Sequence, residues 1–216
     1  MNKGGIIFRG YGKVTDRAMK HLLSDHYLQR KPPMQNTFEW HKGNRILAIS
    51  TFGVPASRHM QLGACPGDPD LVVELNRLWI AGDQKSGTAS WFLAQCLRDM
   101  PARIVLSYAD TAVGHDGTVY RAANFHYAGW TDMDRKTPRF DYIVPGGHSR
   151  DAFRKGAGSN SKKVRRKPKA KYWTVTGTKN DKARLRKMCE WPTLCWRQYP
   201  VPTEHRKFIV DSGVLE

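Results

Sequence analysis

The residues best placed to do chemistry begin with a short loop, Gln84-Lys85-Ser86-Gly87-Thr88-Ala89, between an expected strand and an expected helix. At such a junction, exposed backbone N–H groups and the positive end of the helix dipole can hold a pyrophosphate. Gly87 and Ala89 would keep bulky side chains away from that anion. A plain helix start with Ser86 as its cap explains the same residues about as well.

A second group of candidates follows the next expected strand. Ser107, Tyr108 and Asp110 stand at the carboxyl end of that strand, where the sites of α/β proteins collect. Asp110 can act as a general base or accept a hydrogen bond from a substrate amine, and it can equally cap the following helix. Tyr108 suits stacking on a base, but a place in the core explains it equally well.

Three further residues can accept or donate a proton. Glu74, on the central strand, can be a general base or can simply pair with Arg77 or another cation. His115 precedes Asp116-Gly117 in a tight turn, where it can be a base or a metal ligand, although a histidine bonded to the backbone is more common. Tyr120 is either a proton donor or a core aromatic residue.

These candidates are carried by alternating strands and helices. Periodicity and turn residues predict strands at 37–41, 45–54, 71–80, 103–108, 125–130 and 171–177, and helices at 13–30, 86–100, 117–124 and 179–191. Residues 55–69 are expected to form a loop. The strand–helix–strand order over residues 71–108 is a parallel βαβ unit, so the expected class is α/β, in one domain over residues 1–216.

The charge of the chain favours a nucleic-acid partner. The formal net charge is +17, and residues 149–216 hold 18 of the 36 basic side chains but 6 of the 19 acidic ones. We expect a basic flexible arm at 146–171, with the basic helix at 179–191 as a second grip on double-stranded DNA. A solvated, disordered segment is the alternative for the arm. The expected phosphate contacts are Lys162, Lys163, Arg165, Arg166, Lys167, Lys169 and Lys171.

Cysteine usage and hydropathy bound the cellular setting. The chain has four cysteines, and the sequence shows no signal peptide and no apolar run long enough to span a membrane. We therefore expect a cytoplasmic protein with free thiols. Cys189, Cys195 and His205 fit no common zinc spacing. The oligomeric state is left open.

Two of these patterns resemble the GNAT acyltransferases. The loop at 84–89 resembles their Gln/Arg-x-x-Gly-x-Gly/Ala motif, and Tyr120–Phe125 resembles the Tyr-x-x-x-Gly-Phe that closes their core. Asn124 replaces the glycine, which is acceptable because asparagine also adopts a left-handed cap. The resemblance implies acetyl-CoA or a related coenzyme A compound as the cofactor. Its contacts would be Leu78, Ile80, Gln84, Gly87, Thr88, Ala89, Ser90 and Asn124.

A more specific resemblance comes from four elements in one order. Glu74–Leu78, Ser107–Asp110, Gly114–Tyr120 and the run from Asn124 to Trp130 are similar to the Mom family of phage DNA adenine-modification proteins. The similarity spans about residues 38–131, with a fainter match at 171–200. It implies a GNAT-like mixed sheet flanked by helices, a DNA substrate, an N6-carbamoylmethyladenine product and protection of phage DNA from host restriction. Iron is a further possible cofactor, but no 2-His-1-carboxylate spacing supports it.

In this frame the catalytic candidates are Glu74, Ser107, Tyr108, Asp110, His115 and Tyr120. Glu74 would take the place of the general base of many GNAT enzymes, and Tyr120 would protonate the departing thiolate. Asp110 would hydrogen-bond the adenine N6 amine, and Tyr108 or Trp130 would stack on an extruded base.

The chemistry itself leaves alternatives open. The N6 amine is a poor nucleophile, and simple acetyl transfer would give an amide rather than a carbamoylmethyl group. Either the donor is unusual or a further step follows. One alternative is an ordinary GNAT N-acetyltransferase acting on a protein, an RNA or a small amine. Another is a non-enzymatic DNA-binding protein on a GNAT scaffold.

Overall fold

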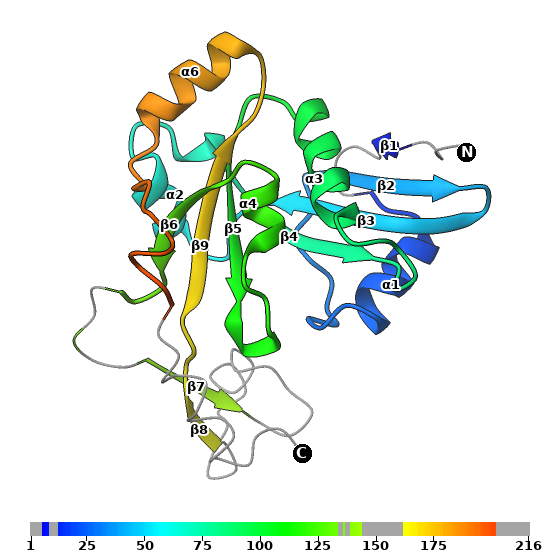
Figure 1. The fold of residues 1–216 in the computed structure, drawn as a ribbon, viewed down its shortest axis with the longest axis horizontal. Coiled ribbons are helices and arrows are strands. Elements are labelled where there is room, and N and C mark those ends of the chain that lie inside the picture. The colour runs from blue at the N-terminus through cyan, green and yellow to red at the C-terminus, as the bar shows by residue number, and fades with distance from the viewer. Residues whose placement is uncertain (1–5, 9–12, 134–135, 137–138, 144–161, 202–216) are drawn as a thin grey trace.

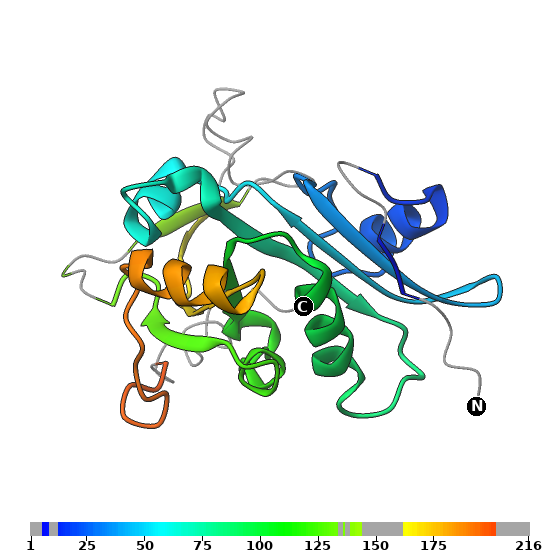
Figure 2. The same ribbon diagram turned by 90° about the horizontal axis from the view of Figure 1, so that it is seen from above.

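The computed structural model describes residues 6–8, 13–133, 136, 139–143 and 162–201. The chain builds one seven-stranded mixed sheet with helices on both faces (Figures 1 and 2). Across that sheet the strands run β1-β2-β3-β4-β5-β9-β6. Their bounds are β1 (Ile6–Phe8), β2 (Asn36–Lys42), β3 (Arg45–Gly53), β4 (Val72–Ile80), β5 (Ile104–Asp110), β6 (His126–Trp130) and β9 (Lys169–Val175).

The order of elements follows from the connections between strands. β1 to β4 pair in antiparallel fashion. Only β2 and β3 are joined by a short turn, whereas longer connections that contain helices join β1 to β2 and β3 to β4. The crossover through a helix between β4 and β5 makes those two strands parallel. β9 returns between β5 and β6 and is antiparallel to both. The expected α/β class, with a mixed sheet flanked by helices, is therefore confirmed.

The helices cover the sheet because its central strand is apolar on both sides. Val105 and Ala109 of β5 belong to the core cluster beneath α3 (Thr88–Asp99) and α4 (Thr118–Ala122). Ile104 and Leu106 belong to the opposite cluster, under α2 (Arg58–Ala64) and α6 (Lys179–Met188). The amphipathic α1 (Asp16–Ser24) buries Ala18 and Leu22 against β3.

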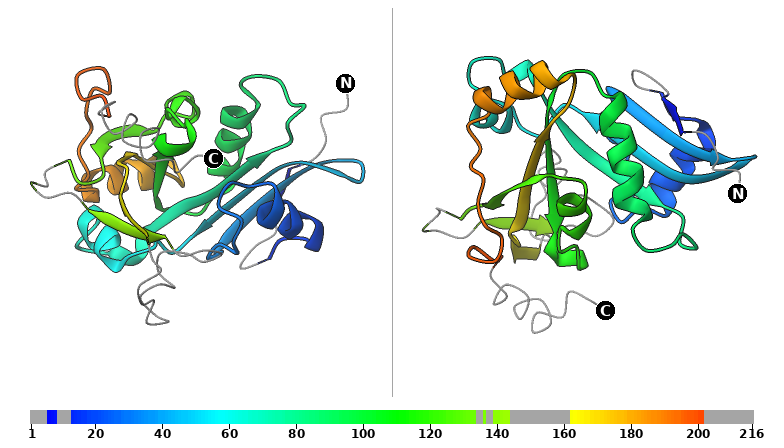
Figure 3. Two further views of the ribbon diagram at one scale, coloured as in Figure 1. Left: turned by 90° about the horizontal axis from the view of Figure 1, so that it is seen from below. Right: turned by 45° about the horizontal axis from the view of Figure 1, so that its top comes forward.

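The two parallel strands separate part-way along their length, and this separation creates room for a site. β4 pairs with β5 only over Val72–Glu74 and Ile104–Leu106. Beyond these residues β4 pairs with β3 and β5 pairs with β9. The second half of each strand therefore turns a main-chain edge toward the space between them (Figure 3, right).

The predicted helices and strands are found, with shifted bounds and three differences. The expected helix at 13–30 is shorter, since α1 ends at Ser24. The expected loop at 55–69 contains α2, whose buried Gln61 donates hydrogen bonds to the carbonyls of Pro69 and Val72. Within the described residues, no helix is long and apolar enough to cross a membrane.

The third difference concerns the basic arm expected at 146–171. Residues 146–161 lie outside the described residues, as does His205. Lys162–Arg165 form β8, which pairs with β7 (Phe140–Ile143), and Lys169 already begins β9. Pairing with other strands orders the described part of this run, so the expectation of a flexible arm is wrong for residues 162–165 and 169–171.

The basic helix does not lie where the sequence suggested. β9 runs antiparallel to β5, pairing Lys169 with Asp110 and Val175 with Ile104, and α6 follows at the Val175 end. α6 is therefore at the opposite end of β5 from Asp110, roughly 20 Å away at the usual strand rise. The contact of α6 with DNA stays a prediction, and it would be made away from the strand ends that carry Asp110.

Candidate active site

A cavity of about 560 Å³ opens where β4 and β5 separate, and it collects most of the predicted catalytic residues. Glu74, Tyr108, His115 and Tyr120 all line it, although they come from different elements. Seven cations surround the same space, two of them from the segment after α1 and four from or beside the basic run. They are Arg30, Lys31, Arg77, Arg139, Arg166, Lys167 and Lys169. The cavity thus combines proton-transfer groups with a positively charged wall.

Glu74 lies where the cavity opens, whereas Asp132, the second acid of the lining, is paired with Arg139. Glu74 is the last residue of β4 that pairs with β5, so its side chain meets the start of the opening. Its carboxylate accepts a hydrogen bond from the Ala56 N–H at 3.3 Å. Burial raises the pKa of Glu74, and this is only partly offset by that hydrogen bond and by the charges of Lys169, Arg77 and Arg30. A carboxyl group tuned in this direction suits general acid–base chemistry.

Tyr120 lies on the other side of the opening and keeps its proton. Its hydroxyl donates to the carbonyl of Tyr108 at 3.4 Å, and its ring packs 5.2 Å from that of Tyr172. Burial raises the pKa of Tyr120, partly offset by a hydrogen bond with Ser107. Ser107 also donates to the carbonyl of Leu75 at 3.4 Å, so it ties Tyr120 to β4. A buried tyrosine that retains its proton can donate it.

Tyr108 is held by other side chains rather than left free to stack. Its hydroxyl donates to the sulfur of Met60 at 3.3 Å, and its ring meets Trp191 edge-on at 6.1 Å. Burial raises the pKa of Tyr108 far above its ordinary value. Trp130, the other expected stacking residue, is not among the residues that line the cavity.

Asp110 is occupied by two partners. One carboxylate oxygen accepts from the Ala112 N–H at 3.0 Å and so caps the short turn Thr111–Val113. The other forms an ion pair with Lys169 at 2.6 Å, in an aspartate that is only 7% exposed. This arrangement matches the capping alternative, and Asp110 acts on the cavity by holding Lys169 at its wall.

His115 sits at the exposed rim of the cavity. Its backbone N–H donates to the carbonyl of Asp110 at 3.1 Å, and its ring meets that of Tyr27 edge-on at 5.2 Å. Among the described residues, no three His, Cys, Asp or Glu side chains gather in a way that could hold a metal ion. The residues of this site do not fit an iron centre, and we derive no step through one.

Arg77 is a cavity residue that the sequence did not single out as functional. It is only 4% exposed, and its guanidinium donates to the carbonyls of Asn76 and Arg30. Its Nε atom is buried without a hydrogen-bond partner among the described residues. A buried donor without a partner is costly, and burial lowers the pKa of Arg77, so this guanidinium gains most from negative charge placed in the cavity. The sequence feature that could have indicated Arg77 is its position within the Glu74–Leu78 element.

The segment after α1 supplies two aromatic rings that the sequence did not indicate as parts of a site. His26 and Tyr27 line the cavity and stack on each other at 4.7 Å. Burial, with the nearby charges of Arg77 and His115, lowers the pKa of His26 to about 4, so this imidazole is neutral near physiological pH. Tyr27 is 42% exposed and therefore offers ring surface at the mouth.

The predicted cofactor loop leads from this cavity to the start of α3. Leu78 lines the cavity, and both Leu78 and Ile80 pack against the main core. Gly87 adopts a left-handed backbone (φ +85°) as the N-cap of α3, with no side-chain cap. The alternative in which Ser86 caps the helix is therefore wrong. Thr88, Ala89 and Ser90 form the first turn. The Thr88 N–H donates to the carbonyl of Lys85 at 3.2 Å, so an anion would meet the backbone N–H groups of Ala89 and Ser90.

Asn124 adopts the left-handed backbone expected of a residue that replaces a glycine. Its φ is +61°, and it ends the turn after α4. This conformation reverses the chain from α4 into β6, so Asn124 shapes the turn next to Tyr120. It belongs to a different turn from Gln84, whose side chain donates to Asp83 at 3.0 Å.

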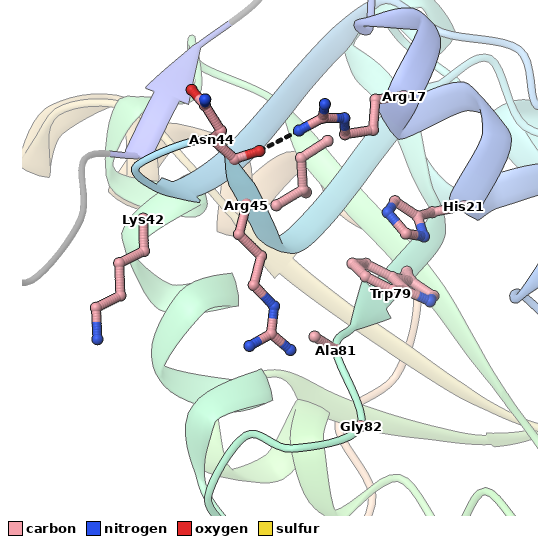
Figure 4. A pocket seen from close by; sticks show the side chains of 9 residues that line it. Arg17, His21, Lys42, Asn44, Arg45, Trp79, Ala81 and Gly82 are labelled. Carbon is pink, nitrogen blue, oxygen red and sulfur yellow. Dashed lines mark hydrogen bonds between the residues drawn. The ribbon is translucent and has the colours of Figure 1, made fainter.

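A second hollow, of about 630 Å³, adjoins this loop at Ala81 and Gly82 (Figure 4). Arg17, Lys42 and Arg45 make it positive, and His21 stacks on Trp79 at 4.4 Å within it. Arg45 pairs with Asp83 at 2.6 Å and so balances the acid next to Gln84. The surroundings of the loop therefore favour an anion.

Comparison with known proteins identifies the family. The profile of the Mom protein family matches residues 13–186. This chain belongs to the Mom protein family. The match extends beyond residues 38–131, over which the sequence resembles the family most clearly. It includes the cavity residues, the loop at 84–90 and the described basic run.

Other comparisons are more distant. The Mom family chain resembles the solved structure of an acetyltransferase of Bacillus subtilis in complex with CoA, with 12% sequence identity and a TM-score of 0.42. That alignment covers 81% of this chain and 100% of the other. No curated protein matches the sequence.

Proposed function

We propose that this protein modifies adenine in DNA, converting it to N6-carbamoylmethyladenine and so protecting phage DNA from host restriction. Membership of the Mom family supports phage DNA modification. The observation that carries the proposal is the cavity between β4 and β5. It holds Glu74 and Tyr120 inside a wall of cations that includes Arg166, Lys167 and Lys169 from the basic run. One surface would therefore bind a polyanion and carry the groups that transfer protons.

A base must leave the duplex to enter this cavity. Extruding adenine costs stacking and pairing energy, which contacts in the pocket must offset. Tyr27 at the mouth offers an exposed ring on which the base can stack, and His26 extends that aromatic surface. The cations around the opening would hold the flanking phosphates and so place the nucleotide.

Inside the cavity the residues divide the proton transfers between them. Glu74 would accept a proton from the N6 amine as the new bond from N6 to carbon forms. Tyr120 would give a proton to the group that leaves the donor. Arg77 would place its positive charge beside the donor, where negative charge gathers. These roles balance the protons of a transfer to N6.

The donor site would run from Leu78 and Ile80 to the loop at 84–90. The first turn of α3 has no side-chain cap, and a Cβ added at Gly87 would meet nothing within 4 Å, so a phosphate can approach the backbone there. Coenzyme A would fit this arrangement with its pyrophosphate at the backbone N–H groups of Ala89 and Ser90. When bound, such a group would supply an activated acyl group. Transfer of that group alone gives an amide at N6, so the carbamoylmethyl product requires a different donor carbon or a further step.

Restriction digestion of plasmid DNA tests the proposal. Plasmid taken from cells that express the protein should resist enzymes whose sites contain adenine, because a bulky N6 substituent projects into the major groove that they contact. Plasmid from cells expressing Glu74→Gln at the same protein level should be cut normally. Complete digestion of both would count against modification and would favour a non-enzymatic DNA-binding protein if the chain still bound duplex DNA.

A further inference from the structure

The two strands β7 and β8 form a separate ribbon at one end of the molecule. Phe140 pairs with Arg165 and Asp141 pairs with Val164, in an antiparallel two-stranded sheet that is not part of the main sheet. The ribbon projects beyond the lower end of β9, on the side away from α6 (Figure 1). Two strands projecting in this way form a narrow element that can enter a groove.

The base of the ribbon is fixed to the rim of the cavity. Arg166, just after β8, donates its backbone N–H to the carbonyl of Arg139, just before β7, at 2.8 Å. The Arg139 side chain pairs with Asp132 at 2.9 Å. Arg139, Asp132, Arg166 and Lys167 all line the cavity. The ribbon therefore starts at the mouth of the candidate active site, and whatever it contacts lies beside the bound substrate.

The ribbon carries an aromatic and cationic surface. Side chains of directly paired residues share one face of a sheet, so Phe140 and Arg165 lie on the same face. Lys163, two residues from Arg165, lies on that face too, with its Nζ 4.4 Å from the centre of the Phe140 ring. Phe140 is 39% exposed, and Lys163 and Arg165 are exposed. Two cations around an exposed ring match the edge of a nucleic acid rather than an apolar partner.

We propose that this ribbon enters the major groove of duplex DNA beside the adenine to be modified. The inference rests on the proposed function, and it names the element that positions the duplex. A two-stranded antiparallel ribbon fits the width of the major groove, whereas the minor groove is about half as wide. The N6 amine of adenine faces the major groove, so a protein that delivers this base to its cavity approaches from that side. Lys163 and Arg165 would meet the phosphates or base edges, and Phe140 would meet a thymine methyl group.

Binding measurements on duplexes with one groove blocked test this directly. The probes are a duplex with glucosylated 5-hydroxymethylcytosines, which fill the major groove, and a plain duplex with the minor-groove ligand netropsin. The wild-type protein should bind the glucosylated duplex at least ~10-fold more weakly than the plain one, the equivalent of losing about one good base contact. Netropsin should leave binding unchanged.

A charge-neutral ribbon and a matched control complete the experiment. Lys163→Gln with Arg165→Gln should lower the salt slope of binding by about 1.8, from about 0.9 for each lost phosphate contact. This variant should also bind the plain and glucosylated duplexes equally. Arg184→Gln with Lys187→Gln removes the same charge from exposed positions on α6, at the other end of the sheet. It should keep the preference for the plain duplex.

Three results overturn the inference. They are equal binding of both duplexes by the wild type, competition by netropsin, and retention of the preference by the ribbon variant. If plasmid DNA is nevertheless modified, only the ribbon assignment fails. If the wild type neither binds duplex DNA nor modifies it, the proposed function fails as well. Thermal melts of the ribbon variant should match those of the wild type, which would show that its main sheet is intact.

Discussion

A single methyl group at Gly117 tests how closely the turn before α4 is built around Tyr172. Gly117 has a left-handed backbone (φ +77°), and a Cβ there would overlap the hydroxyl and ring carbons of Tyr172. Tyr172 is 1% exposed and cannot swing aside. A left-handed backbone costs a non-glycine residue about 1–2 kcal/mol, and overpacking adds about 1–3 kcal/mol. The expected loss for Gly117→Ala is therefore about 2–5 kcal/mol.

Gly114→Ala is the matched control for this substitution. Gly114 has nearly the same backbone (φ +79°), but a Cβ there meets nothing within 4 Å. It should lose only the conformational part, about 1–2 kcal/mol. For a chain of this size each kcal/mol lowers Tm by roughly 2–4 °C. Thermal melts followed by circular dichroism should place Gly117→Ala well below Gly114→Ala. Equal melting temperatures for the two variants would refute the packing argument.

Three further predictions concern the candidate active site. Glu74→Gln should lower turnover at least ~10²-fold if the carboxylate is the base. Because burial raises the pKa of Glu74, kcat/KM of the wild type should fall as pH drops through that raised pKa. The same shift makes the ionised carboxylate destabilising above that pKa, so Glu74→Gln should raise Tm near neutral pH. A lower Tm for this variant would contradict the argument from burial. Tyr120→Phe should also lose at least ~10²-fold in turnover with unchanged DNA affinity, and full activity would make Tyr120 a core residue. Ala89→Glu should abolish coenzyme A binding in calorimetry and leave the helix intact, since an acid suits its first turn. Ala89→Gln should bind more tightly than Ala89→Glu, and equal binding by both would remove the pyrophosphate from this loop.

Local patterns predicted the parts of the fold that depend on local chemistry. Alternating apolar runs placed β4, α3 and β5, because a strand buried on both faces is recognisable from its own residues. The left-handed Asn124 was expected because it replaces the glycine of the GNAT pattern that residues 120–125 resemble. The gathering of Glu74, Tyr108, His115 and Tyr120 was expected from the family resemblance, and the separation of β4 from β5 gives it a physical cause.

Contacts between distant segments explain what the sequence could not predict. The basic run at 162–165 looks solvated by composition, but it is ordered by pairing with Phe140–Ile143 about twenty residues earlier. His26 and Tyr27 fall within the helix predicted at 13–30, but α1 ends at Ser24, and both residues reach the cavity from the irregular segment that follows. Asp110 looked like a base, but its ion pair with Lys169 depends on β9 lying beside β5.

Mass spectrometry of nucleosides tests the central claim most directly. DNA digested from cells that express the wild-type protein should contain an adenine nucleoside heavier than deoxyadenosine by a carbamoylmethyl substituent. DNA from cells that express Glu74→Gln at an equal level should contain none. An added acetyl group instead would contradict the proposed product and support ordinary acyl transfer. Unmodified adenine in cells with abundant folded wild-type protein would contradict the assignment of this cavity as a DNA-modifying active site.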